Sequence, residues 1–169
     1  MQVLLSPQQL DLTIKRLCYQ LLENDDNLSD VVFVGIQPRG VQFSNRIIDF
    51  ISEISNSEKP SYGLLDITFY RDDIREELHI PKETTLTQSI EGKKVVLIDD
   101  VLYTGRTIRA ALDALQDFGR PQKVMLCVLV NRRFNRELPI QPDFYGIAID
   151  TTASQKVKVD NENNRVILY

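Results

Sequence analysis

A nine-residue segment, 99–107, places two kinds of polar group next to each other. It reads Asp-Asp-Val-Leu-Tyr-Thr-Gly-Arg-Thr and directly follows the apolar run 95–98. The adjacent carboxylates of Asp99 and Asp100 are costly to bury together unless hydroxyl groups or cations meet them. The Thr-Gly-Arg-Thr turn leads into a helix, where free backbone N–H groups and the helix dipole attract a phosphate. Acceptors for sugar hydroxyls beside donors for a phosphate indicate a site for a ribose 5-phosphate rather than a solvated acidic turn.

The segments around this loop alternate between strand and helix patterns. Short apolar runs predict strands over 31–34, 64–70, 95–98, 124–130 and 144–149. Apolar residues at helical spacing predict a helix that Ser6 caps and Pro7 begins, with later helices over 40–54 and 107–118. This order is typical of the α/β class with a mostly parallel sheet. Ligands of such sheets bind at the carboxyl ends of strands, which directs attention to the loops after 34, 98 and 130.

Two segments fall outside that alternation. Residues 71–93 are polar and charged and include Pro81, which predicts a mobile excursion over about 70–93, either a strand pair or a flap. Segments 156–159 and 166–169 flank Asn-Glu-Asn-Asn and predict a C-terminal hairpin. We expect one domain over 1–169.

Composition narrows the classes of function. The chain of 169 residues is 43% hydrophobic and 26% charged, which is typical of a soluble globular protein, and its net charge of −4 provides no global basic field for nucleic acid. It contains no apolar run long enough for a transmembrane helix, and its N-terminus lacks the pattern of a signal peptide. Cys18 and Cys127 lie in apolar runs, which favours buried free thiols and a cytoplasmic protein.

Segment 95–107 resembles the phosphoribosyl pyrophosphate (PRPP) signature of type I phosphoribosyltransferases. Gly-Ile-Gln-Pro-Arg-Gly at 35–40 resembles the pyrophosphate loop of that family. Segments 65–73, 119–121 and 136–140 resemble the PyrR group of pyrimidine-operon regulators and uracil phosphoribosyltransferases. The resemblance runs from about residue 5 to 152. It implies the type I fold, a mostly parallel central sheet flanked by helices with a small hood or flap.

The resemblance implies a role for each part of the site. Asp99 and Asp100 would hold the ribose 2′- and 3′-hydroxyls and contribute indirectly to a Mg²⁺ site. The 5′-phosphate loop would be formed, largely through backbone N–H groups, by Val101, Leu102, Tyr103, Thr104, Gly105, Arg106 and Thr107. The pyrophosphate loop and flap would contribute Gln37, Pro38, Arg39, Gly40 and Arg71. Arg39 would join the two acids as a catalytic residue, by stabilising the leaving pyrophosphate.

The implied reaction is Mg²⁺-dependent transfer of phosphoribose from PRPP to uracil, giving UMP and pyrophosphate. The segment after the fourth strand departs from the PyrR pattern Asp-Arg-Gly-His-Arg-Glu-Leu-Pro. Here it reads Asn-Arg-Arg-Phe-Asn-Arg-Glu-Leu-Pro over 131–139, so the acid is an amide, Gly-His is absent and one residue is inserted. The base-loop candidates are Asn131, Arg132 and Phe134. A purine acceptor stays open.

A second interpretation is a nucleotide-sensing, RNA-binding transcriptional attenuator with weak or no catalysis. The same pocket would then bind PRPP, UMP or UTP. Binding to an mRNA leader needs clustered Lys and Arg side chains, but the first helix offers only Lys15 and Arg16. Clustering of these two with Arg132 and Arg133 on one exposed surface would favour the regulator. The resemblance also implies a homodimer or a higher homo-oligomer.

Overall fold

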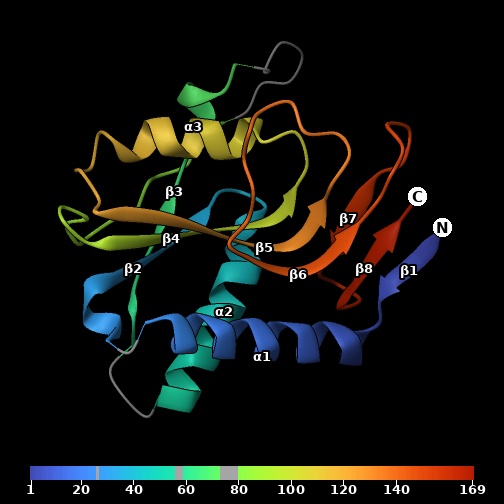
Figure 1. Ribbon diagram of the computed structural model, residues 1–169, viewed down its shortest axis with the longest axis horizontal. Coiled ribbons are helices and arrows are strands. Elements are labelled where there is room, and N and C mark those ends of the chain that lie inside the picture. Colours follow the sequence, from blue (N-terminus) through green and yellow to red (C-terminus); the bar gives the residue numbers. More distant parts are fainter. Residues whose placement is uncertain (26, 56–58, 73–79) are drawn as a thin grey trace.

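A computed structural model describes residues 1–25, 27–55, 59–72 and 80–169. Its centre is a five-stranded parallel sheet in the order β3-β2-β4-β5-β6 (Figure 1). The strands are β2 (Val31–Ile36), β3 (Ser61–Leu65), β4 (Lys94–Leu102), β5 (Lys123–Arg132) and β6 (Phe144–Ile149). Helices α1 (Pro7–Asn24) and α2 (Gly40–Ser55) cover one face, and α3 (Arg106–Leu115) covers the other (Figure 1). The α/β fold with a mostly parallel sheet is therefore confirmed.

The burial pattern explains why these segments form this sheet. All six residues of β2 are buried, and so are most of β4 and β5, as expected for parallel strands covered by helices on both faces. One core lies between the sheet and the helices α1 and α2, and a second lies between the sheet and α3. At the start of α1, Ser6 and Gln9 form a capping box and Pro7 occupies the first turn. None of the described helices is both long and apolar enough to cross a membrane.

The C-terminal hairpin is present and is joined by a strand that the sequence did not predict. Strands β7 (Val157–Asp160) and β8 (Arg165–Leu168) pair antiparallel, and β1 (Gln2–Leu5) adds to the free edge of β8. This three-stranded sheet lies beside β6, next to the two chain termini (Figure 1). Residues 2–5 form a strand because they pair with residues 166–168, and a contact between segments so far apart in the chain leaves no local pattern in the sequence.

The predicted strand over 64–70 is wrong in its position. Strand β3 ends at Leu65, and the short 3-10 helix η2 (Thr68–Tyr70) follows. The Asp66 carboxylate causes this turn, because it accepts hydrogen bonds from the Thr68 N–H at 2.9 Å and the Lys82 N–H at 3.1 Å. A side-chain carboxylate that accepts a hydrogen bond from the backbone N–H two residues later favours a turn over a strand.

The flap prediction concerns residues 70–93, of which 73–79 lie outside the described residues. The part from 80 onwards returns alongside β3, where the Thr85 N–H donates to the Leu64 carbonyl at 2.9 Å. In the described parts of the flap, 70–72 and 80–93, no strand pair forms. The base of the flap is thus fixed to the sheet at Leu64 and Asp66.

Candidate functional site

The loops that follow β2 and β4 meet the end of β5 at one cavity of about 510 Å³. These segments lie at the carboxyl ends of adjacent parallel strands, where the sequence analysis predicted that a ligand binds. The residues that line this cavity come from six separate parts of the chain: Ile36, Gln37, Pro38, Arg39, Arg71, residues 99–108, Arg132, Glu137 and Val157. Most of the predicted site residues therefore lie around one space.

The two acids lie within β4 rather than after it. Asp99 pairs with Val128 of β5, and its side chain is only 5% exposed. The Asp100 N–H donates to Asp99 Oδ1 at 2.9 Å. Burial raises the pKa of Asp99 well above its usual range and the charge of Asp100 raises it further, while the positive charge of Arg39 opposes both effects. Burial also raises the pKa of Asp100, again opposed by Arg39. Both carboxylates therefore gain from a ligand that supplies hydroxyl donors or a cation.

The phosphate turn is built on Gly105. This residue has φ 94°, in the left-handed region, and precedes the first residue of α3. Gly105 has no side chain that could cap the helix, and the first N–H groups of any α-helix lack an intrahelical partner. The Arg106 N–H donates to Thr104 Oγ1 at 3.3 Å. Residues 104–108 line the cavity, so the start of α3 faces a space in which its N–H groups could meet an anion.

The loop at 35–40, which resembles the pyrophosphate loop, approaches Asp99 closely because residue 40 is a glycine and has no Cβ atom. A Cβ atom at this position would lie 2.7 Å from the Ile98 carbonyl oxygen and 3.2 Å from the Asp99 Cα. Gln37 is buried, and its side-chain amide donates to the Glu83 carbonyl at 2.7 Å. Its own N–H donates to the Leu65 carbonyl at 3.0 Å. Gln37 thus fixes the loop to the flap, while Pro38 and Arg39 remain exposed at the cavity.

The side chain of Arg106 contributes to the flap more than to the phosphate turn. Its guanidinium donates to Glu137 and, at 2.9 Å, to Asp72 Oδ2. Arg109 of the same helix contacts that Asp72 oxygen at 3.2 Å. Asp72 therefore connects the base of the flap to α3 next to the cavity. Arg71, one residue earlier, lines the cavity itself.

The base loop shows the largest difference from expectation. Asn131 is buried, and its Oδ1 accepts from Arg136 Nη2 at 2.7 Å. The Arg132 guanidinium lies over the Tyr103 ring, 3.7 Å from its centroid, and Arg136 donates to the Tyr103 carbonyl. Phe134 is 74% exposed and does not line the cavity. Of the three base-loop candidates, only Arg132 reaches the cavity lining.

Some lining residues were not predicted. Val157 comes from β7, and nothing in its sequence context distinguishes it from a core valine. Glu137 belongs to the segment that resembles the PyrR group, so the resemblance was the signal that could have found it. No group of three or more His, Cys, Asp or Glu side chains in the described part of the chain is placed to hold a metal ion. A divalent cation here would need oxygen atoms of the ligand besides Asp99 and Asp100.

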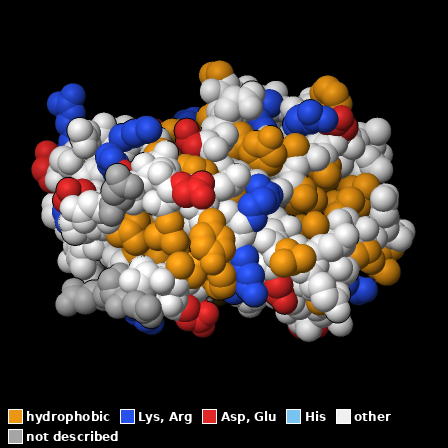
Figure 2. Space-filling model, turned by 60° about the horizontal axis from the view of Figure 1, so that its bottom comes forward, with side chains coloured by type: hydrophobic (Ala, Val, Ile, Leu, Met, Phe, Trp, Pro, Cys, Tyr) orange, Lys and Arg blue, Asp and Glu red, His pale blue; other side chains and the backbone are white. Residues whose placement is uncertain are grey.

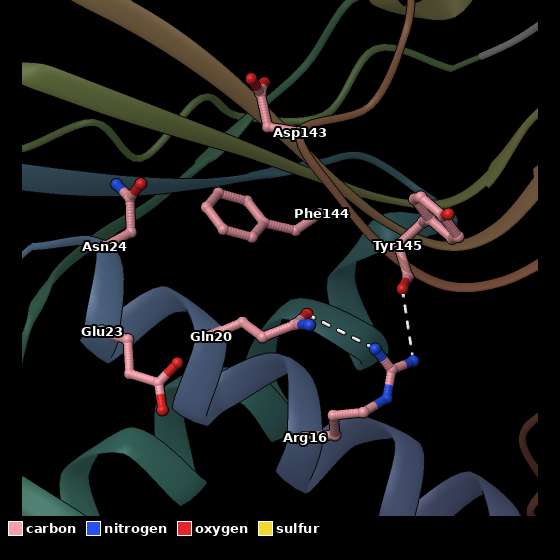
Figure 3. Close-up of a pocket in the computed structure, with 7 residues that line it drawn as sticks. All are labelled: Arg16, Gln20, Glu23, Asn24, Asp143, Phe144 and Tyr145. Carbon is pink, nitrogen blue, oxygen red and sulfur yellow. Dashed lines mark hydrogen bonds between the residues drawn. The ribbon is translucent and has the colours of Figure 1, made fainter.

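A second cavity, of about 470 Å³, lies between α1 and the start of β6 (Figure 3). Arg16 donates to the Tyr145 carbonyl at 3.4 Å and also to the Gly146 carbonyl, so it covers backbone acceptors of this edge strand. Asp143 accepts from the Leu126 N–H at 2.8 Å. These polar groups serve the fold, and nothing comparable to the acid pair and phosphate turn adjoins them.

Comparisons with known proteins agree with this geometry. The family model described as the phosphoribosyl transferase domain matches residues 4–164. A protein of Synechocystis sp. named bifunctional protein PyrR is 43% identical over 157 residues, covering 92% of this chain and 87% of its own length. A protein of the same name from Latilactobacillus sakei is 49% identical over 149 residues, covering 85% of this chain and 82% of its own.

Solved structures agree at the level of the fold. A hypoxanthine phosphoribosyltransferase from Staphylococcus aureus superimposes with a TM-score of 0.70 at 24% identity, covering 89% of this chain and 78% of that one. A structure from an analysis of an invariant aspartic acid in HPRTs reaches a TM-score of 0.78 at 15% identity, covering 99% and 94%.

Proposed function

We propose that this chain, which belongs to the phosphoribosyltransferase family and within it to the bifunctional PyrR proteins, transfers phosphoribose from PRPP to uracil. The products would be UMP and pyrophosphate. One observation carries the proposal: the acid pair, the open start of α3 and the Arg39 loop surround a single cavity. These groups match the ribose hydroxyls, the 5′-phosphate and the pyrophosphate of PRPP in turn.

Separate groups of residues would bind the ribose, the 5′-phosphate and the pyrophosphate. Asp99 and Asp100 accept hydrogen bonds from the ribose hydroxyls and orient the ring, and the N–H groups of residues 105–107 hold the 5′-phosphate. Arg39 and Arg71 stabilise the negative charge that collects on the departing pyrophosphate. The flap, fixed at Asp66 and Asp72, excludes water that would hydrolyse the activated sugar.

Mg²⁺ is part of this proposal, because the carboxyl groups of Asp99 and Asp100 line the same cavity as the Arg39 loop, where a pyrophosphate would bind. The protein alone does not complete a metal site in its described residues, so the ion would enter with PRPP and keep ligand oxygens and water. When bound, it neutralises charge on the pyrophosphate.

The distribution of basic side chains favours transfer over RNA binding as the function of the described surface. Arg132 is buried, Arg133 pairs with Asp150 at 2.7 Å, and Arg16 is bound to backbone carbonyls of β6. Lys15 lies over the ring of Phe50. Figure 2 shows lysines and arginines scattered among hydrophobic side chains on the viewed face rather than gathered in one patch. The word bifunctional in the relatives' names keeps regulation as the second candidate function.

Hydrophobic side chains on α1 support a homo-oligomer as part of the proposal. Leu12 is 65% exposed and Tyr19 is 50% exposed, and Tyr19 contacts the ring of Phe50 on α2 edge-on. Sedimentation at several protein concentrations would test this, and a monomer at all of them would contradict it.

The test of the proposed function is a coupled assay for pyrophosphate release from PRPP with Mg²⁺, with UMP identified by chromatography. Uracil, cytosine, hypoxanthine and guanine would be offered separately. Turnover with uracil alone is expected. Turnover with a purine instead of uracil would show that the acceptor base is a purine. Tight PRPP binding without turnover on any base would favour the sensing function.

A further inference from the structure

Arg71, which lines the cavity, directly follows a segment that packs against α3. Ile67 is buried in the core that α3 covers, and the Tyr70 ring packs against the same core. The Tyr70 hydroxyl also donates a hydrogen bond to Asp117, just after the end of α3. Figure 1 shows the short 3-10 helix η2, drawn in green, beside α3. The backbone that leads into Arg71 therefore has a fixed place on this helix.

Asp72 fixes the backbone on the other side of Arg71. Its Oδ2 accepts from Arg106 Nη1 at 2.9 Å and lies 3.2 Å from Arg109 Nη2. Both arginines belong to the first turn of α3, where the positive end of the helix dipole attracts a carboxylate as well. Glu137 accepts from Nε of the same Arg106 guanidinium. The carboxylate of Asp72 thus meets a group that is already oriented by a second partner.

The exposure of these ion pairs indicates what Asp72 contributes. The side chains of Arg106, Arg109 and Asp72 are 35%, 38% and 43% exposed. Ion pairs with this degree of exposure add little to overall stability. They can still restrict a short segment that is anchored next to them, because only a few backbone angles are left to be fixed. The effect of Asp72 should therefore appear in the placement of Arg71 and not in the melting temperature.

We infer that Asp72 is a positioning residue, which holds the Arg71 side chain at the cavity in a fixed place relative to the start of α3. This inference rests on the proposed function, in which the start of α3 binds the 5′-phosphate of PRPP and Arg71 binds its pyrophosphate. Because Asp72 attaches the segment of Arg71 to α3, it sets the spacing between the two anion-binding groups. A long side chain that is ordered before the ligand arrives loses less entropy on binding.

The first experiment compares two ligands that differ in the pyrophosphate group. PRPP and ribose 5-phosphate are titrated separately, each with Mg²⁺, into the wild type, Asp72→Asn and the control Asp113→Asn, which removes another carboxylate beside Arg109, 3.5 Å away. The ratio of PRPP to ribose 5-phosphate affinity should fall about 3- to 10-fold in Asp72→Asn, as expected when one long side chain has to be ordered on binding. It should stay unchanged in Asp113→Asn, and the melting curves of all three proteins should coincide.

The sign of this effect separates positioning from charge. Removal of a negative charge by itself strengthens the binding of an anion, so a fall in the ratio cannot come from the lost charge of Asp72. An unchanged or raised ratio in Asp72→Asn would overturn the inference. Asp72→Glu keeps the charge and should lose less than Asp72→Asn.

A double-mutant cycle shows whether Asp72 acts through Arg71. Arg71→Gln alone should lower the same ratio about 10-fold, as expected for one charge-assisted contact. Adding Asp72→Asn to Arg71→Gln should lower it no further, because the side chain to be positioned is gone. A further loss equal to that of Asp72→Asn alone would contradict the inference, and so would an unchanged ratio in Arg71→Gln.

The second experiment needs no ligand, so it separates failure of the inference from failure of the proposed function. The ¹⁵N heteronuclear NOE of the Arg71 backbone amide and of its Nε is measured in the wild type, Asp72→Asn and Asp113→Asn. Both values should fall in Asp72→Asn and stay unchanged in Asp113→Asn, because this measurement reports motion on the ps–ns timescale. Equal values in all three proteins would rule out positioning by Asp72. If the wild type binds no PRPP and turns over no base, the proposed function fails, and the NOE of Arg71 still decides whether Asp72 holds it.

Discussion

The carboxyl ends of β4 and β5, each with the loop that follows it, border the same cavity, yet they use their polar groups in opposite ways. At the end of β4, the carboxylates of Asp99 and Asp100 form no ion pair in the described part of the chain, and the first N–H groups of α3 lack helical partners. At the end of β5 and in its loop, Asn131, Arg132 and Arg136 are all bound to protein atoms. The first loop keeps its binding capacity for a ligand, whereas the second mainly builds the wall behind Tyr103. Substitutions in the first should therefore affect ligand affinity, and those in the second should mainly affect stability, with Arg132 as the exception.

The largest effect is expected from replacing both acids. Asp99→Asn with Asp100→Asn should lower the affinity for PRPP at least about 100-fold, because two charge-assisted hydrogen bonds to ribose hydroxyls are lost. The thermal unfolding temperature should not fall, since the substitution removes two buried like charges. Calorimetric titration and a melting curve measure both quantities. Asp150→Asn, which alters an exposed ion pair away from the cavity, serves as the control.

A substitution at Gly105 should also lower ligand affinity, by a smaller factor than the double substitution of the acids. Gly105→Ala places a Cβ at φ 94°, 3.3 Å from Ile140 Cδ1, and should lower affinity for ribose 5-phosphate about 10-fold through a strain of roughly 1–2 kcal/mol in the phosphate turn. Gly92→Ala is matched, because Gly92 also has positive φ, 67°, but lies outside the cavity lining. It should reduce stability and leave affinity intact. Equal affinities of the two variants would show that the turn does not hold the phosphate.

The pH dependence of stability gives a third test of the acid pair. Because burial raises the pKa of Asp99, the folded protein holds this proton more tightly than the unfolded chain does. The wild type therefore loses stability as the pH rises from about 4, the ordinary Asp value, through the raised pKa. The free energy of unfolding of Asp99→Asn relative to wild type should grow over that interval. Chemical denaturation at a series of pH values measures it, and a constant difference would contradict the raised pKa.

The smallest effect on ligand affinity is expected from a substitution at Asn131, at the end of β5. Asn131→Asp puts a carboxylate where Asn131 Oδ1 now accepts from Arg136 at 2.7 Å, and it should raise the free energy of unfolding by roughly 1 kcal/mol. Affinity for ribose 5-phosphate should stay within about twofold, since Asn131 does not line the cavity. Melting curves and titration check this pair of results. A large loss of ligand affinity would mean that the second loop is not mainly structural.

The same contrast explains what the sequence could predict. The site after β4 is contiguous, and its parts are a buried strand, an acid pair and a glycine turn, so local pattern and resemblance locate it together. The contacts of Arg132 join residues far apart in the chain, because Thr151 and Gln155 come from the approach to the hairpin and Tyr103 comes from β4's loop. No local pattern encodes such contacts. The strand predicted over 64–70 failed for a related reason, since the turn at Asp66 depends on Lys82 and Thr84.

The position of the ribose 5-phosphate is the central claim, and backbone amide NMR tests it most directly. Ribose 5-phosphate would be titrated into uniformly ¹⁵N-labelled protein, and the amide signals would be followed along the chain. The largest shifts should fall on Gly105, Arg106 and Thr107, with smaller shifts at Asp99 and Asp100 and none at Arg16 or Tyr145 around the second cavity. Saturable shifts centred on any other segment, with residues 104–107 unchanged, would contradict the assignment of this loop as the phosphate site.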